Sequence, residues 1–75
     1  MFRPNDVIQF NENHKWAGCF GLIHEIKHYE HDIRYMVGVP VPENGTAFIF
    51  VMESDNAIEY LGQAILVMAD SENEE

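Results

Sequence analysis

Basic side chains are scarce in this sequence. Its four Lys and Arg residues face thirteen Asp and Glu residues, which gives a formal net charge of −9. The four are Arg3, Lys15, Lys27 and Arg34, and they are dispersed along the chain. Because affinity for DNA or RNA rests largely on cations that neutralise phosphates, nucleic acid is an unfavourable partner. Excess acid instead favours solubility, or attraction to basic protein surfaces.

Cysteine and long apolar runs are also nearly absent. The single cysteine, Cys19, cannot form an intramolecular disulfide, which suits a reducing cytoplasm. The longest apolar runs, TAFIFVM and AILVMA, fall far short of the roughly 18 residues that a membrane span requires. Pro, Asn and Asp interrupt the opening MFRPNDVIQF, unlike a signal peptide. We therefore expect a cytoplasmic protein without membrane contact.

A chain of 75 residues has room for one domain. Residues 70–75 carry four carboxylates and no apolar side chain. Such a segment cannot bury enough apolar surface to offset the entropy of ordering it. We predict one domain over residues 1–69 and a disordered acidic tail over residues 70–75.

The pattern of apolar residues predicts three strands, two from alternation and one from a continuous apolar run. Ile8 and Phe10 share a face in VIQF, and a second strand, IRYMVGV, carries Ile33, Tyr35, Val37 and Val39 on one face. The segment TAFIFVME is apolar on both faces, which predicts a strand that is central or covered on both sides. Asn44-Gly45 tolerates positive φ and predicts a tight turn between the last two strands.

Two segments fit either a helix or a strand. In LIHEIKHYEH, helical spacing groups Leu22, Ile26, Tyr29 and Ile33, whereas strand spacing groups Leu22, His24, Ile26 and His28. The helix would lack an N-cap, since Gly21 precedes it, so we favour the strand. In SDNAIEYLGQAILVM, Gly62 weakens a helix. There we favour a short helical turn or a strand near residues 55–61, a bend at Gly62 and a final strand over residues 63–68.

The letters HEIKH, from His24 to His28, match the H-E-x-x-H pattern of zinc peptidases. On a helix the two imidazoles could share an ion. Along a strand the four-residue step spans about 13 Å, too far for zinc–nitrogen bonds of about 2.0 Å. We therefore predict no enzyme and no cofactor. A metal site formed by His24, His28 and His31 stays open as an alternative if the segment is helical.

Aromatic side chains suggest a binding surface instead of a catalytic one. Trp16 lies in the polar loop NENHKWAG, and tryptophan is enriched at interface hot spots. We predict a partner-binding site formed by Trp16, Phe20, Tyr29 and Tyr35. Phe48 and Phe50 are expected in the core.

The segments NDVIQF and AGCFGLIHEI together resemble a KOW-type motif, the opening of an SH3-like barrel. The matching positions, within residues 5–40, are Asp6, Val7, Ile8, Gly18, Gly21, Ile23 and Ile26, followed by the strand RYMVGV. The resemblance implies an all-β barrel of about five antiparallel strands. The chain also looks like the small acidic accessory proteins of phages and mobile elements.

Together these observations lead us to expect a non-catalytic protein–protein interaction module. Its acidic surface would engage a basic host surface, with the module a monomer or weak homodimer. A KOW-type nucleic-acid-binding protein and a metal-binding protein that uses HEIKH are the alternatives.

Overall fold

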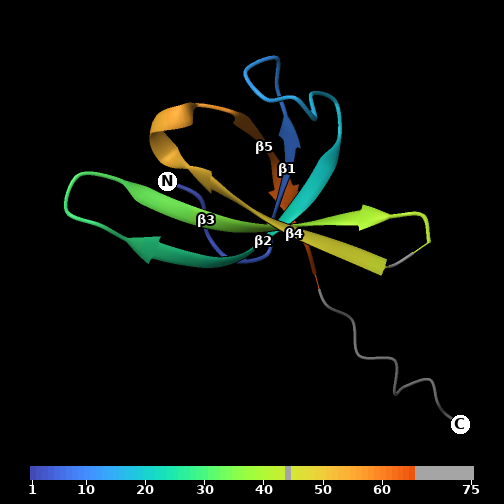
Figure 1. The fold of residues 1–75 in the computed structure, drawn as a ribbon. Helices are drawn as coiled ribbons and strands as arrows, with labels where there is room; N and C mark the ends of the chain where they lie inside the picture. Colours follow the sequence, from blue (N-terminus) through green and yellow to red (C-terminus); the bar gives the residue numbers. More distant parts are fainter. Residues whose placement is uncertain (44, 66–75) are drawn as a thin grey trace, which may run out of the picture.

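Five strands form one antiparallel sheet in the computed structural model, which describes residues 1–43 and 45–65. The strands are β1 (Asp6–Phe10), β2 (Phe20–His28), β3 (Ile33–Val41), β4 (Gly45–Met52) and β5 (Ile58–Gln63), with a 3-10 turn, η1 (Glu53–Asp55), between the last two. Their order across the sheet is β4-β3-β2-β1-β5. Figure 1 shows that the β2–β3 hairpin and the β3–β4 hairpin extend to opposite sides of the molecule. The predicted all-β class is confirmed.

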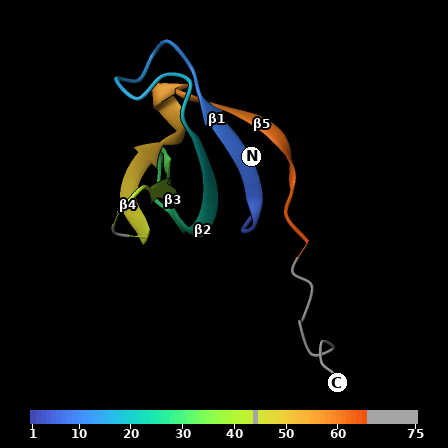
Figure 2. The same cartoon turned by 90° about the vertical axis from the view of Figure 1, so that its right-hand side faces the viewer.

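The sheet is curved but not closed. Figure 2 shows a bent layer with β4 and β5 at its two ends. Among the described residues β5 pairs only with β1, and β4 pairs only with β3. The predicted closed barrel is therefore wrong in this respect: the two edge strands lack the mutual ladder that closure requires.

The core lies on one face of the curved sheet. Its buried apolar residues are Ile8, Phe10, Ile23, Tyr35, Val37, Val39, Val51, Ala57 and Ile58. Alternation in β1 and β3 therefore predicted the buried faces of both strands correctly.

No helix among the described residues has the length and apolar character needed to cross a membrane.

The contested HEIKH segment lies in β2, which confirms the strand interpretation. A β-bulge at His24 changes which residues share a face. Ile23 pairs with Val37 and Ile26 with Tyr35, so both isoleucines point inward although they are three residues apart. The predicted grouping of His24 with Ile26 and His28 on one face is therefore wrong. The bulge inserts one extra residue and inverts the alternation beyond it.

The strand β4 is an edge strand, not a central one. Its inward residues Ile49 and Val51 face the core side, while Phe48 and Phe50 point outward with 53% and 57% of their surface exposed. The prediction that these phenylalanines are buried is wrong, because no second layer covers the outer side of β4 in the described structure. Asn44 of the predicted turn lies outside the described residues.

The end of the described chain also differs from expectation. The last strand observed, β5, covers residues 58–63, where a short helical turn or a strand was predicted. The 3-10 turn comes earlier, at residues 53–55. Leu61 is the extra residue of a second bulge, because Val7 pairs with Gly62 and Ile8 with Tyr60. The bend expected at Gly62 is thus a bulge beside it. Residues 66–68 of the predicted final strand and the predicted tail lie outside the described residues.

Two glycines, Gly18 and Gly21, mark the passage into β2. Gly18 adopts a φ of +91°, in the left-handed region that glycine favours. Gly21 is buried, and a Cβ there would lie 2.6 Å from Val37 Cγ1. The close approach of β2 to β3 at this point therefore requires a residue without a side chain.

Candidate functional site

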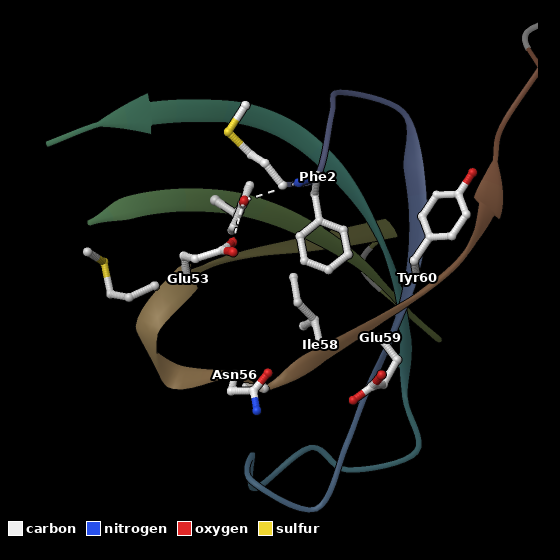
Figure 3. A pocket seen from close by; sticks show the side chains of 10 residues that line it. Phe2, Glu53, Asn56, Ile58, Glu59 and Tyr60 are labelled. Carbon is white, nitrogen blue, oxygen red and sulfur yellow. Dashed lines mark hydrogen bonds between the residues drawn. The ribbon is translucent and has the colours of Figure 1, made fainter. Parts of the chain in front are cut away.

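A hollow of about 360 Å³ opens between the N-terminal segment, η1 and β5 (Figure 3). Its walls include aromatic, aliphatic and carboxylate side chains from segments that are distant in the sequence. Among the residues that line it are Phe2, Tyr35, Glu53, Ile58, Glu59 and Tyr60. We refer to this feature as the hollow.

Tyr35, in β3, connects two of the segments that form the hollow, the N-terminal segment and η1. Its hydroxyl donates a hydrogen bond to Glu53 Oε1 at 2.5 Å and accepts one from the backbone N–H of Phe2 at 3.2 Å. The rings of Phe2 and Tyr35 meet edge to face, with centroids 5.3 Å apart. The N-terminal segment and η1 are thereby held against the middle of β3.

The pKa of Tyr35 is raised to about 12, first by burial and then by its hydrogen bond to Glu53. The phenol therefore stays neutral at physiological pH and keeps donating to that carboxylate. Glu53 itself is exposed, and Tyr35 is the only described side chain that donates a hydrogen bond to it. Its second oxygen, Oε2, can accept a bond from a ligand.

The rest of the hollow combines aromatic rings with a second carboxylate at the rim. Ile58 and Tyr60 alternate with Glu59 along β5, and Asn11 Nδ2 donates a hydrogen bond to Glu59 Oε2 at 2.8 Å. Tyr60 is 54% exposed. Both charged side chains that line the hollow, Glu53 and Glu59, are thus acidic, and aromatic rings line it with them. Carboxylates next to aromatic faces are groups that attract an ammonium or guanidinium.

A second surface lies on the face of β2, β3 and β4 that points away from the core, which we call the outer face. Arg34 stacks on Phe50, with 4.1 Å between the guanidinium carbon and the ring centroid. Lys27 is the cross-strand neighbour of Arg34, and its ammonium lies 5.5 Å from the Tyr29 ring. Two of the four basic residues in the chain therefore share one face with exposed aromatic rings.

The four residues predicted to bind a partner do not form one surface. Trp16 is half-buried and packs edge-on against Phe10, with ring centroids 6.3 Å apart. Phe20 and Tyr29 are exposed, but they lie at opposite ends of β2. Tyr35 is buried in the core, and it reaches the surface region only as part of the hollow.

The histidines considered as metal ligands are also separated. His24 packs on the outer face against Phe48, with ring centroids 5.0 Å apart. His28 pairs with Ile33 and points to the other side of the sheet. His31 is exposed, and its Nε2 lies 3.6 Å from Glu30 Oε2. Within residues 1–43 and 45–65, no three His, Cys, Asp or Glu side chains gather in a way that could hold a metal ion.

Sequence reasoning missed Phe2, Glu53 and Tyr60. No local pattern marks them, because the hollow forms only when β5 pairs with β1 and Phe2 folds onto Tyr35. The exposure of Phe48 and Phe50 did have a signal, since they alternate with Ala47, Ile49 and Val51.

Comparison of the chain with protein-family models, with curated proteins and with solved structures finds no match. Function is therefore inferred from the side chains of the hollow and of the outer face.

Proposed function

We propose that this chain is a non-catalytic protein-binding module that takes a Lys or Arg side chain of a basic partner into the hollow. One observation carries the proposal: the exposed carboxylate of Glu53 and the rings of Phe2 and Tyr60 line the same hollow, and every charged side chain that lines it is acidic. A cation placed there meets a charge-assisted acceptor and ring faces together.

The shape of the hollow suits a long basic side chain. Lys and Arg carry aliphatic stems that bury along apolar surface while the charged head remains near polar groups. Ile58 and Met52 supply apolar wall, and Glu53 Oε2 is the acceptor for the head. The net charge of −9 would also steer a basic partner toward the molecule and speed its encounter.

The order of the strands supports the proposal that this binding module has an SH3-like fold. The first strand lies between β2 and β5, and a 3-10 turn joins β4 to β5, an arrangement similar to that of SH3-like barrels. The resemblance to acidic accessory proteins of phages and mobile elements makes a host protein the partner that we propose. A small module with one such site would act by occupying a basic surface.

Binding of short peptides to matched variants tests the proposal. The probe is a fluorescent peptide with alternating Lys and Gly residues, and an equivalent Glu and Gly peptide serves as the acidic control. Glu53→Gln should weaken binding of the basic peptide about tenfold, as expected for one charge-assisted contact. Glu43→Gln makes the same charge change on an exposed residue outside the hollow and should alter binding less than about twofold.

The outcomes separate a site from a general charge effect. Equal losses in Glu53→Gln and Glu43→Gln would mean that net charge alone attracts the peptide, and the proposed site would be wrong. Tyr60→Ala should also weaken binding, because it removes a ring from the wall of the hollow. Unchanged binding in that variant would contradict the aromatic part of the proposal.

The outer face favours a KOW-type nucleic-acid binder as the second candidate. Lys27 and Arg34 lie beside Tyr29 and Phe50, and rings next to cations can stack bases of a single strand. A gel-shift experiment with a ten-nucleotide oligouridine at low salt tests this. Retardation that is lost in Arg34→Ala and decreases steeply with salt would support it. The absence of any retardation would remove it.

A further inference from the structure

The strand β4 has an unusual edge. Among the five described strands it alone carries no charged residue, with the sequence GTAFIFVM. Its eight residues pair with β3 on one side, and no described strand pairs with its other side. Unpaired backbone donors and acceptors on a long apolar edge are a template for another strand.

The opposite edge of the sheet is protected by comparison. The strand β5 is shorter, carries Glu59 and contains the bulge at Leu61. Charge, short length and bulges are the features that prevent edge-to-edge pairing. The two edges therefore differ in their capacity to accept a strand, and β4 is the open one.

We propose that β4 pairs antiparallel with β4 of a second copy of this chain, centred on Ile49. The sheets of two copies would then continue into each other across a two-fold axis. Centring on Ile49 sets Phe48 of each copy opposite Phe50 of the other on the outer face. Aromatic cross-strand pairs of this kind stabilise antiparallel ladders, and the pairing covers rings that are 53% and 57% exposed.

The composition of the edge favours a second copy as the occupant. Two chains of net charge −9 repel wherever their acidic surfaces meet, and β4 is the strand that itself contains no carboxylate. Antiparallel pairing centred on Ile49 brings Glu43, before one β4, close to Glu53 and Asp55, which follow the other. These like charges repel at both margins, so the aromatic pairs in the middle of the strand stabilise the contact and salt strengthens it.

Sedimentation equilibrium of matched variants tests the proposal. The wild-type chain should show a concentration-dependent dimer below about 100 µM, and added salt should strengthen it by screening repulsion. Phe48→Lys should raise the dimer dissociation constant at least about tenfold, because it places a charge on the apolar edge, opposite Phe50 of the other copy, on which Arg34 stacks. Leu61→Lys replaces a similarly exposed apolar residue on β5, outside the hollow, and should leave the dimer unchanged.

Cysteine crosslinking decides the register. Paired residues in an antiparallel ladder have Cα atoms about 4.5–5.5 Å apart, which suits a disulfide. With exposed Cys19 replaced by Ser, Ile49→Cys should oxidise to a covalent dimer. Leu61→Cys, on the protected edge, should not. Crosslinking through Ile49→Cys also tests the pairing of β4 with β4 if circular dichroism shows that Phe48→Lys is unfolded.

A wild-type chain that stays monomeric at millimolar concentration would overturn the proposal. So would crosslinking through Leu61→Cys in preference to Ile49→Cys. The result is independent of the hollow, because binding of the basic peptide is tested with Glu53→Gln and dimerisation with variants of β4. Either proposal can therefore fail while the other stands.

Discussion

The phenolic hydroxyl of Tyr35 donates a 2.5 Å hydrogen bond to Glu53, which ties the middle of β3 to the 3-10 turn that follows β4. The same oxygen accepts a bond from the N–H of Phe2. One buried phenol thus fixes two walls of the hollow while leaving Glu53 exposed. Removal of the Tyr35 hydroxyl should therefore affect both the stability of the fold and binding in the hollow.

Tyr35→Phe keeps the ring and removes only the hydroxyl. We expect a loss of about 1–2 kcal/mol in the free energy of unfolding, because the Phe2 N–H and the Glu53 carboxylate each lose a partner. Urea denaturation measures this loss. Tyr29→Phe removes an exposed hydroxyl and should change stability by less than about 0.5 kcal/mol.

The same pair of variants has a pH signature. The pKa of Tyr35 rises from 10.0 to about 12 in the folded chain. Above pH 10 the unfolded chain therefore releases this proton while the folded chain retains it. The stability that this group contributes is complete below pH 10 and is lost as the pH rises toward about 12. Tyr35→Phe should lack this decrease, and an identical pH profile in both chains would contradict the raised pKa.

Asp6 is the one buried charged residue in the described core, at 2% exposure. Its carboxylate accepts bonds from the Arg3 N–H at 2.8 Å and from Gln63 Nε2 at 2.7 Å. Asp6→Ala leaves both donors unpaired and should lower the free energy of unfolding by about 2–3 kcal/mol. Glu12→Ala, an exposed acid in the next loop, is the matched control and should have little effect. Equal effects in thermal unfolding would mean that Asp6 acts only through charge.

Gly21 tests the close approach of β2 to β3. Gly21→Ala would place a methyl group 2.6 Å from Val37 Cγ1 and 3.1 Å from the Gly38 carbonyl oxygen. We expect a cost of about 1–3 kcal/mol, as for overpacking in a core. Gly62→Ala has nothing within 4 Å of the new methyl group and should be neutral or slightly stabilising. Denaturant unfolding of both variants checks the difference.

Alternation of apolar residues correctly predicted the features that depend on one strand alone. In β1 and β3 the period of two runs unbroken, and Ile8, Tyr35 and Val37 are buried as expected. It failed in β2, because the bulge at His24 is set by how β2 and β3 pair and has no mark in either segment alone. It also failed to place β4, since an apolar strand is central or at an edge according to the number of strands beside it.

The candidate site was less accessible to sequence reasoning. Tyr35 was named as a partner-binding residue on the basis of its aromatic character, yet its ring is in the core and its hydroxyl contributes to the hollow. Phe2, Glu53 and Tyr60 come together only through tertiary pairing of the N-terminal segment and β5. Local composition contains no information about such a convergence, whereas the acidic balance did indicate the charge of the partner that we propose.

Zinc provides the last prediction, because HEIKH lies on a strand whose bulge directs His24 and His28 to opposite faces. One ion cannot bind both imidazoles across the sheet at zinc–nitrogen distances of about 2.0 Å. A bound metal at a hundred times its dissociation constant would add about 2.7 kcal/mol to stability. We expect instead that zinc changes the melting temperature of the wild-type chain no more than that of the double variant His24→Ala, His28→Ala. Each chain is compared with its own metal-free form. A rise in melting temperature in the wild-type chain alone would show that the two histidines cooperate, and the strand geometry at His24 would have to be revised.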